Sequence, residues 1–437
     1  MTGEAVGRRS DAPSRVWTRC SPASGSTAMV SGFLWTLVVG RAASEAADRA
    51  MLIGESGECV SAKETVVRAE RLAATLLGEG VRPGMRVAWQ LTNSIDAVLV
   101  LLALARLGAV QVPLDAALTE KQTRSASEAL HVEAFICRAP RSGGENAEGP
   151  KGRPLAGRLL ITSPSPSEGR RAGVPLPPYR AADGNPQWLF STFTSAGMVQ
   201  SILHTDISLG TAARGLLANA QFDHVLRSAT GAVVVPIAEV QGLIGLAAML
   251  VLGAPVVLIE PHKPPHIVGV LREFDIGVVA ASDDLCGSLL TLRRALPRGS
   301  DLVPKMRLLV VLGDVHTHEM DVGAERELGA VVCRAYGCPE VPVVCTGESV
   351  DVGRRRGSFM GIPISGVRAR VTVGGLPVRE GVHGDIEVSG AGVCSGYVET
   401  AHNYAAFTDD GWYRTGDRGR LTLDGRLQVF DSGRRRH

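Results

Sequence analysis

The sequence predicts an α/β protein with two sheets rich in parallel strands, each flanked by helices, followed by a small module that is mostly antiparallel or barrel-like. Short apolar runs alternate with helical patterns within 33–137 and again within 231–334, and these two stretches predict the two sheets. After Gly357 short apolar runs alternate with glycine-rich turns, which predicts the β-rich module. A chain of 437 residues is long enough to bury several cores.

The first stretch contains a strand, a helix and a second strand. Residues 87–91 form a short apolar run that predicts a strand, and 97–107 are apolar almost all round, as expected of a buried helix. The Asn-Ser pair ending at Ser94 can cap that helix, and Gly108 suits the left-handed residue that follows it. Residues 109–112 predict the second strand, so we expect a parallel crossover unit.

The second stretch repeats this alternation at greater length. Each apolar run has the length of a buried strand, and each segment between two runs has the length and pattern of a helix. The predicted strands are residues 232–235, 256–259, 276–280, 307–312 and 330–333, and the predicted helices are 241–252, 265–274, 283–295 and 317–328.

The remaining segments are rich in turn-forming residues. Residues 138–187 hold many Gly, Pro, Ser and Arg, which predicts an exposed connection with a single strand at 159–162. In the β-rich module we expect strands at 367–373, 384–389 and 420–430, and no helix of any length. The expected division is a leader at 1–32, either disordered or reflecting a start codon assigned too early, two α/β subdomains at 33–190 and 191–356, and the module at 357–437.

The composition excludes several classes of protein. The chain is 45% apolar and 21% charged, with a net charge of +2, so there is no electrostatic reason to expect binding to nucleic acid. No apolar run is long enough to span a bilayer. The eight cysteines form no Cys-x-x-Cys pair and lack zinc-ligand spacing, so we expect reduced thiols in a cytoplasmic protein.

The most specific motif is Gly-Trp-Tyr-Arg-Thr-Gly-Asp, which ends at Asp417 and is followed by the pair Gly433-Arg434. This combination resembles the adenylate-forming superfamily of acyl-CoA synthetases, peptide-synthetase adenylation domains and luciferase. The resemblance implies that the predicted sheets form the N-terminal body of such an enzyme, that Asp417 holds the ATP ribose and that Arg434 lies at the hinge. In that family a small C-terminal lid domain follows the hinge. Because the sequence stops at His437, we expect this lid to be absent.

A second box corresponds to the family's phosphate loop, but departs from it. The resemblance implies that the hydroxyls of Thr192, Thr194 and Ser195 contact phosphate, and that Gly197 gives the loop flexibility. Phe-Thr replaces the family's Ser-Gly at 193–194, and Gln200 replaces the loop lysine. Glutamine supplies a dipole where lysine supplies a full charge, so we expect weaker handling of the β- and γ-phosphates.

Two further motifs correspond to the family's contacts with adenine and magnesium. Gly313 and Asp314 follow a strong strand and match the turn beside the adenine. The run Tyr-Gly-Cys-Pro-Glu, from Tyr336 through Gly337 to Glu340, resembles the family's Tyr-Gly-x-Thr-Glu. By resemblance Tyr336 lies near adenine and Glu340 is a Mg²⁺ ligand, while a proline takes the place of the threonine that touches the α-phosphate.

The acyl pocket is expected around a Pro-Ile-Ala-Glu-Val-Gln-Gly box at 236–242. By resemblance its lining residues are Glu239, Val240, Gly242, Ala335 and Gly337. Glu239 stands where an aromatic residue or a histidine is usual. Its carboxylate either selects an acid that also carries an amine, repels the substrate, or is exposed without a role.

The resemblance implies ATP-dependent activation of a small carboxylic acid as an acyl-adenylate, with Mg²⁺ as cofactor. CoA or the phosphopantetheine thiol of a carrier protein would be the acceptor, as for an acid–thiol ligase. One hypothesis is an enzyme that is impaired alone or needs a stand-alone lid domain. The alternative is a non-catalytic descendant that binds AMP, an acyl-adenylate or a partner protein.

Overall fold

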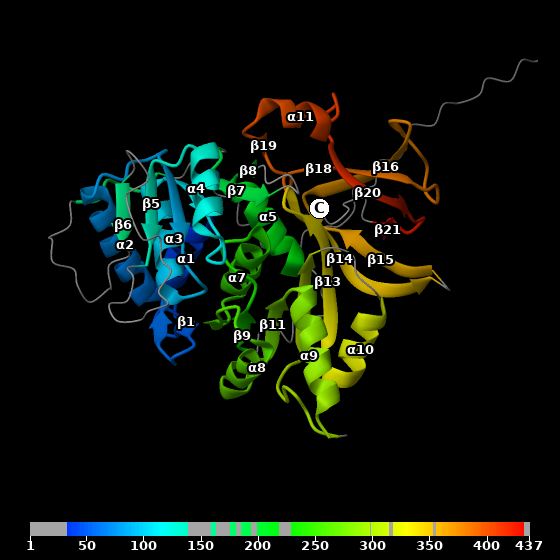
Figure 1. The fold of residues 1–437 in the computed structure, drawn as a ribbon, viewed down its shortest axis with the longest axis horizontal. Coiled ribbons are helices and arrows are strands. Elements are labelled where there is room, and N and C mark those ends of the chain that lie inside the picture. Colours follow the sequence, from blue (N-terminus) through cyan, green and yellow to red (C-terminus); the bar gives the residue numbers. More distant parts are fainter. Residues whose placement is uncertain are drawn as a thin grey trace, which may run out of the picture.

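Two β-sheets organise the fold (Figure 1). The computed structural model describes residues 33–138, 159–162, 175–180, 185–193, 199–217, 229–297, 299–313, 318–352 and 355–431. Within these ranges one sheet has seven strands and the other has 14. The smaller sheet has the order β19 (Gly396–Tyr397), β8 (Val199–His204), β7 (Trp188–Phe193), β4 (Val110–Pro113), β3 (Arg86–Gln90), β5 (Ala134–Cys137) and β6 (Leu159–Thr162).

The larger sheet is parallel in its centre and antiparallel toward one end. Its parallel strands run in the order β13 (Val331–Cys338), β12 (Leu308–Gly313), β11 (Val278–Ala281), β9 (Gly231–Val233), β10 (Val256–Leu258) and β1 (Ala50–Gly54). The short strand β2 (Cys59–Ser61) pairs antiparallel with β1 at the edge. Each predicted strand of the second stretch is therefore present, and all of them belong to this one sheet.

The helices form layers on the faces of the two sheets. Five helices pack in the core between the sheets: α1 (Phe33–Ala42), α2 (Ala62–Gly78), α3 (Ile95–Leu107), α5 (Asp206–Leu217) and α7 (Val240–Leu252). The other face of the large sheet is covered by α8 (Pro264–Glu273), α9 (Asp283–Ala295) and α10 (His318–Leu328). Helix α4 (Glu120–Ala129) covers the other face of the small sheet. None of the described helices is long and apolar enough to cross a lipid bilayer.

The predicted crossover unit forms as its residues indicate. Ser94 caps α3 by accepting a hydrogen bond from the Ala97 backbone N–H at 3.2 Å. Gly108 ends the helix in the left-handed conformation, with φ of 69°. Asn93, predicted to share in the cap, instead bridges the sheets: its buried amide donates to the carbonyl of Val235 at 3.0 Å, and its oxygen accepts from the Ile237 N–H at 2.8 Å.

The strands after the parallel region extend the large sheet. They are β14 (Val341–Val352), β15 (Arg355–Pro363), β16 (Val367–Val373), β17 (Leu376–Pro377), β18 (Gly384–Gly390), β20 (Tyr413–Leu421) and β21 (Leu427–Asp431). They are antiparallel, as predicted, and in the described ranges they form an open sheet without closing into a barrel.

Several details of this region were predicted wrongly, and strands β14, β15 and β17 were not predicted at all. The single strand predicted at 420–430 is the end of β20 plus β21, separated by a turn in which the Thr422 N–H donates to the Arg426 carbonyl at 2.8 Å. Gly425 adopts a φ of 80° in that turn, a conformation that glycine tolerates best. The helix α11 (Thr400–Ala406) was also missed, because its seven residues include no buried side chain and so give no apolar period.

Candidate functional site

A buried tyrosine and a buried aspartate form the centre of the candidate site. Tyr336 on β13 donates a hydrogen bond from its hydroxyl to Oδ2 of Asp417 on β20 at 2.5 Å. The two side chains are 3% and 2% exposed. Burial, together with the Asp417 carboxylate, raises the pKa of the Tyr336 hydroxyl well above its usual value. The contact brings together two sequence boxes that lie 81 residues apart.

The backbone around Asp417 is held by Thr415. The Thr415 hydroxyl accepts a hydrogen bond from the Asp417 N–H at 3.1 Å and donates to the carbonyl of Ile386 at 2.9 Å. Gly416 between them has a φ of 78°. The Thr-Gly-Asp sequence therefore lies at an irregularity in the register of β20 against β18, and its hydrogen bonds hold the backbone of Asp417 beside Tyr336.

A second buried pair contains the predicted metal ligand. Glu340, in the turn between β13 and β14, accepts a hydrogen bond at Oε1 from the Tyr397 hydroxyl at 2.6 Å. The Cys394 N–H donates to the Glu340 carbonyl at 2.8 Å. Because β19 pairs Tyr397 with Ile202 of β8, this contact joins the Tyr-Gly-Cys-Pro-Glu turn to the hairpin that carries the phosphate-loop sequence.

His204 makes a further link between these segments that the sequence reasoning missed. Its ring is fully buried, and Nε2–H donates to the Pro339 carbonyl at 2.7 Å while Nδ1 accepts from the Ser208 hydroxyl at 2.8 Å. Burial lowers the pKa of His204 to about 4, although the Pro339 carbonyl and the Glu340 carboxylate favour the charged form. The imidazole is thus neutral and positions the turn ahead of Glu340. Its place directly after the phosphate-loop box was the available signal.

This lowered pKa predicts a pH effect on stability. The folded state binds a proton at His204 less tightly than the unfolded state does. The stability that neutral His204 contributes is therefore fully present above pH 6.5 and is lost as the pH falls from 6.5 toward 4. The loss should be about 3 kcal/mol in the free energy of unfolding. Denaturant unfolding at several pH values should show a shallower acid slope for His204→Gln than for the wild type. The partly exposed His402→Gln should keep the wild-type slope; equal slopes for wild type and His204→Gln would contradict the assignment.

The phosphate-loop hairpin is described only at its two strands. Thr192 of β7 lies directly opposite Gln200 of β8 in the antiparallel register. Thr194, Ser195 and Gly197 fall in residues 194–198, outside the described residues. Asp314 and Arg434 also lie outside the described residues. Gly313, the last residue of β12, is the register partner of Tyr336 on β13.

The two glycines predicted to line the acyl pocket are required by backbone packing. A Cβ on Gly242 would overlap the carbonyl of Pro236, and one on Gly337 would overlap the carbonyl of Pro342. Their neighbours Val240 and Ala335 are each 3% exposed. Close packing of the chain thus accounts for these glycines.

Glu239 precedes α7 and makes no side-chain hydrogen bond to the helix end. Its side chain has solvent-accessible surface, yet enough protein atoms surround it to raise the pKa of its carboxyl to about 7, with a smaller contribution from Asp115. The residue is exposed to solvent. Near neutral pH the group is divided between its neutral and charged forms.

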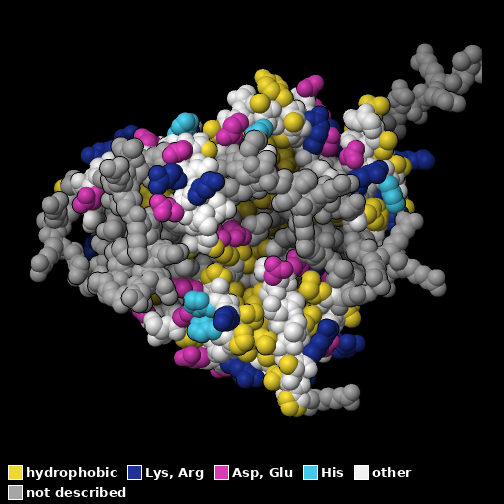
Figure 2. Space-filling model, in the orientation of Figure 1, with side chains coloured by type: hydrophobic (Ala, Val, Ile, Leu, Met, Phe, Trp, Pro, Cys, Tyr) yellow, Lys and Arg dark blue, Asp and Glu magenta, His cyan; other side chains and the backbone are white. Residues whose placement is uncertain are grey.

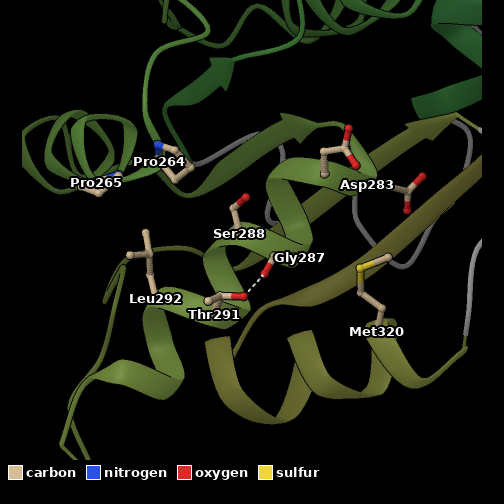
Figure 3. A pocket seen from close by; sticks show the side chains of 9 residues that line it. Pro264, Pro265, Asp283, Gly287, Ser288, Thr291, Leu292 and Met320 are labelled. Carbon is tan, nitrogen blue, oxygen red and sulfur yellow. Dashed lines mark hydrogen bonds between the residues drawn. The ribbon is translucent and has the colours of Figure 1, made fainter.

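A cavity of about 570 Å³ lies apart from these pairs, between α8, α9 and α10 (Figure 3). Its lining includes Pro264, Asp283 and Met320, and none of the predicted site residues. Asp283 also accepts a hydrogen bond from Arg334 at 2.8 Å. Because the carboxylates of Asp283 and Asp284 line it and no lysine or arginine does, the cavity does not suit the phosphates of ATP.

Comparison with known proteins decides the family. Residues 39–398 match the family model described as AMP-binding enzyme. The chain belongs to the AMP-binding enzyme family. Novobiocin biosynthesis protein H of Streptomyces niveus is 29% identical over 411 residues, covering 85% of this chain and 61% of that protein. The 2-succinylbenzoate–CoA ligase of Bacillus pumilus is 27% identical over 203 residues, covering 46% of this chain and 40% of the ligase. This AMP-binding family member thus spans less than two thirds of either relative.

A solved structure confirms the fold of this AMP-binding family member. O-succinylbenzoate coenzyme A synthetase (MenE) from Bacillus subtilis, in complex with ATP and magnesium ion, superposes with a TM-score of 0.73 at 20% identity. The match covers 90% of this chain and 79% of the synthetase. The α/β fold predicted for an adenylate-forming enzyme body is therefore correct.

Proposed function

We propose that this chain activates a small carboxylic acid as an acyl-adenylate. The observation that carries the proposal is the Tyr336–Asp417 pair, with Gly313 beside it and Glu340 four residues along the chain. In the proposed reaction an oxygen of the acid bonds to the α-phosphorus of ATP, the bond to the β-phosphate breaks, and pyrophosphate leaves. Transfer of the acyl group to CoA or to a carrier-protein thiol would follow.

We propose that Asp417 accepts hydrogen bonds from the ribose hydroxyls and that Tyr336 flanks the adenine. Hydrogen bonds to a charged group are stronger than those between neutral groups. A carboxylate fixed by Tyr336 and Thr415 is already oriented, so little ordering remains to be done when the nucleotide binds. Arg434 is proposed to act at the hinge, and the hydroxyls of Thr192, Thr194 and Ser195 at the phosphates.

The residues around Glu340 fit Mg²⁺ in the way ATP enzymes hold it. Mg²⁺ is commonly bound through one or two carboxylates together with substrate phosphates and water, which a single glutamate allows. Tyr397 holds Oε1 of Glu340, which fixes the orientation of the carboxylate. When bound, the ion would neutralise phosphate charge.

A second candidate function is binding of AMP or an acyl-adenylate without catalysis. Two observations favour it. Gln200 provides no positive charge opposite Thr192, and Pro339 has no hydroxyl, while its carbonyl is occupied by His204. Both features weaken contacts to the phosphates, whose charge changes during the reaction, so they affect catalysis more than binding. The proposed contact to the ribose is unaffected.

Trapping the product tests the proposed function. The full chain would be incubated with ATP, Mg²⁺, hydroxylamine and a panel of carboxylic acids, including some that carry an amine because Glu239 borders the expected pocket. The proposal expects an acyl-hydroxamate with at least one acid, and formation of the product should require both ATP and Mg²⁺. A parallel series would add a separate C-terminal lid domain from a relative. If the chain binds nucleotide but no acid gives a hydroxamate, with or without the lid domain, the result would favour nucleotide binding without catalysis.

A further inference from the structure

A cluster of two histidines and two glutamates lies at the far edge of the large sheet. Glu55 directly follows β1, whereas Glu260, His262 and His266 lie between the end of β10 and the first turn of α8. Because β1 and β10 are parallel neighbours, the residues after their carboxyl ends meet at one edge of the sheet. In Figure 2 histidine side chains stand among acidic ones in the region that Figure 1 labels β1 and α8.

The ligand atoms of this cluster are close enough for one metal ion. Nε2 of His266 lies 3.3 Å from Oε2 of Glu55, and Nε2 of His262 lies 3.9 Å from the same oxygen. Glu55, His262 and His266 each offer one ligand atom, and these three atoms all lie within 4.8 Å of one another. Bonds of about 2.0–2.1 Å in a tetrahedral zinc site place neighbouring ligand atoms roughly 3.3–3.4 Å apart. The cluster therefore needs only small side-chain movements to close around an ion.

Other contacts orient the two carboxylates. The Glu260 N–H donates to Oε1 of Glu55 at 2.6 Å, while Oε2 of Glu55 faces the histidines. Thr92 donates to Oε1 of Glu260 at 2.7 Å, and Oε2 of Glu260 lies 3.3 Å from Nε2 of His262. In each glutamate one oxygen is held by a hydrogen bond and the other faces an imidazole. Such supporting contacts are typical around metal ligands.

The backbone between the histidines is constrained by two prolines. Pro264 and Pro265 occupy the first positions of α8, where the fixed proline φ suits a helix start. The His262 N–H also donates to the Glu260 carbonyl at 2.7 Å, and the His266 N–H donates to the Lys263 carbonyl at 2.9 Å. The prolines and these hydrogen bonds therefore restrict the backbone between the two histidines and fix the distance between their imidazoles.

The charge of the cluster favours a cation. Among the residues that the structure describes, the ion-pair partners of Glu55 and Glu260 are His262 and His266 alone. No lysine or arginine among the described residues forms an ion pair with either carboxylate, so no permanent positive charge compensates the two glutamates. A divalent cation would supply that charge.

We propose that Glu55, His262 and His266 bind Zn²⁺, with Glu260 as a fourth ligand. Two imidazoles and carboxylate oxygens suit zinc, whereas Mg²⁺ prefers a shell made only of oxygen. The site is separate from Glu340: β10 is four strands and β1 five strands from β13, or roughly 20 Å at the usual strand spacing. The ion would tie the turn after β1 to the start of α8 at the edge of the sheet.

Calorimetric titration of the metal-free full chain with Zn²⁺ tests the proposal. We expect one saturable site, at least tenfold weaker in His262→Gln/His266→Gln and in Glu55→Gln, since even residues that support metal ligands typically change affinity 10- to 100-fold. His402→Gln, which alters a histidine elsewhere on the surface, should leave the affinity unchanged. Mg²⁺ at the same concentrations should give no saturable binding at this site.

Cys59 needs its own control because it is an exposed thiol on β2 and pairs with Ile53 of β1. Cys59→Ser should retain the zinc site; loss of binding in this variant would assign the ion to the thiol and overturn the proposal. Unchanged affinity in the double histidine variant would also overturn it. Zinc should raise the thermal midpoint of the wild type but not that of the double variant, and a double variant with the wild-type metal-free midpoint is correctly folded.

Discussion

Asp417→Asn is expected to weaken ATP binding roughly 10- to 100-fold. Replacing the carboxylate by an amide removes charge-assisted hydrogen bonds to the proposed ribose position, each worth about 1.5–3 kcal/mol, and about 1.4 kcal/mol corresponds to one decade of affinity. The change also alters the acceptor of the Tyr336 hydroxyl, so ribose and adenine contacts are affected together. Isothermal titration calorimetry with ATP measures the effect.

The matched control for this prediction is Asp385→Asn. Asp385 lies on the neighbouring strand β18, opposite Arg418, and its side chain is 66% exposed, so the variant makes the same chemical change outside the buried pair. Its ATP affinity should equal that of the wild type. If Asp417→Asn keeps the wild-type affinity as well as its thermal midpoint, the nucleotide does not bind at Asp417.

Gln200→Lys is expected to increase acid-dependent adenylation by on the order of 10²-fold, the effect of one oriented charge-stabilising donor on a developing transition state. Gln200 is half-buried on β8, opposite Thr192, and therefore lies at the base of the loop that carries the proposed phosphate contacts. An ammonium there would act on charge that builds up on the leaving pyrophosphate. The rate of hydroxamate formation under saturating ATP measures the change in adenylation.

Gln200→Met is the control for side-chain length, since it resembles lysine in reach but has no charge. Its rate should not exceed that of the wild type. If the wild type is active and Gln200→Lys lowers the rate, the glutamine is adapted to this loop and the interpretation of a weakened phosphate site is wrong.

The elements that sequence predicted best are those specified by local residues. The α3 helix needed only its apolar run, the cap at Ser94 and the stop at Gly108, all of which lie within 15 residues. Five parallel strands of the large sheet, β9 to β13, were found for the same reason, because buried strands are continuous apolar runs bounded by turns. The sixth, β1, was not predicted. The turn between β20 and β21 was missed, since it replaces an apparent single strand and depends on the conformation at Gly425.

The sequence motifs of the candidate site could be predicted, but the contacts between their residues could not. The motifs indicated Tyr336, Glu340 and Asp417 individually. No local pattern could show that Tyr336 bonds Asp417, that Tyr397 holds Glu340, or that His204 bonds the Pro339 carbonyl, because these pairs span 57 to 135 residues. The contacts of Tyr397 and His204 also depend on how the two sheets meet.

ATP–pyrophosphate exchange tests the central claim most directly, because it requires formation of the adenylate and its reversal at the same site. The full chain would be assayed with Mg²⁺ and a panel of acids, alone and with a separate lid domain. We predict exchange that depends on one class of acid and is lost in Glu340→Gln, while Glu399→Gln, which changes a glutamate beside β19, retains it. No exchange with any acid or lid, despite measurable ATP binding, would contradict the claim that this chain forms an acyl-adenylate.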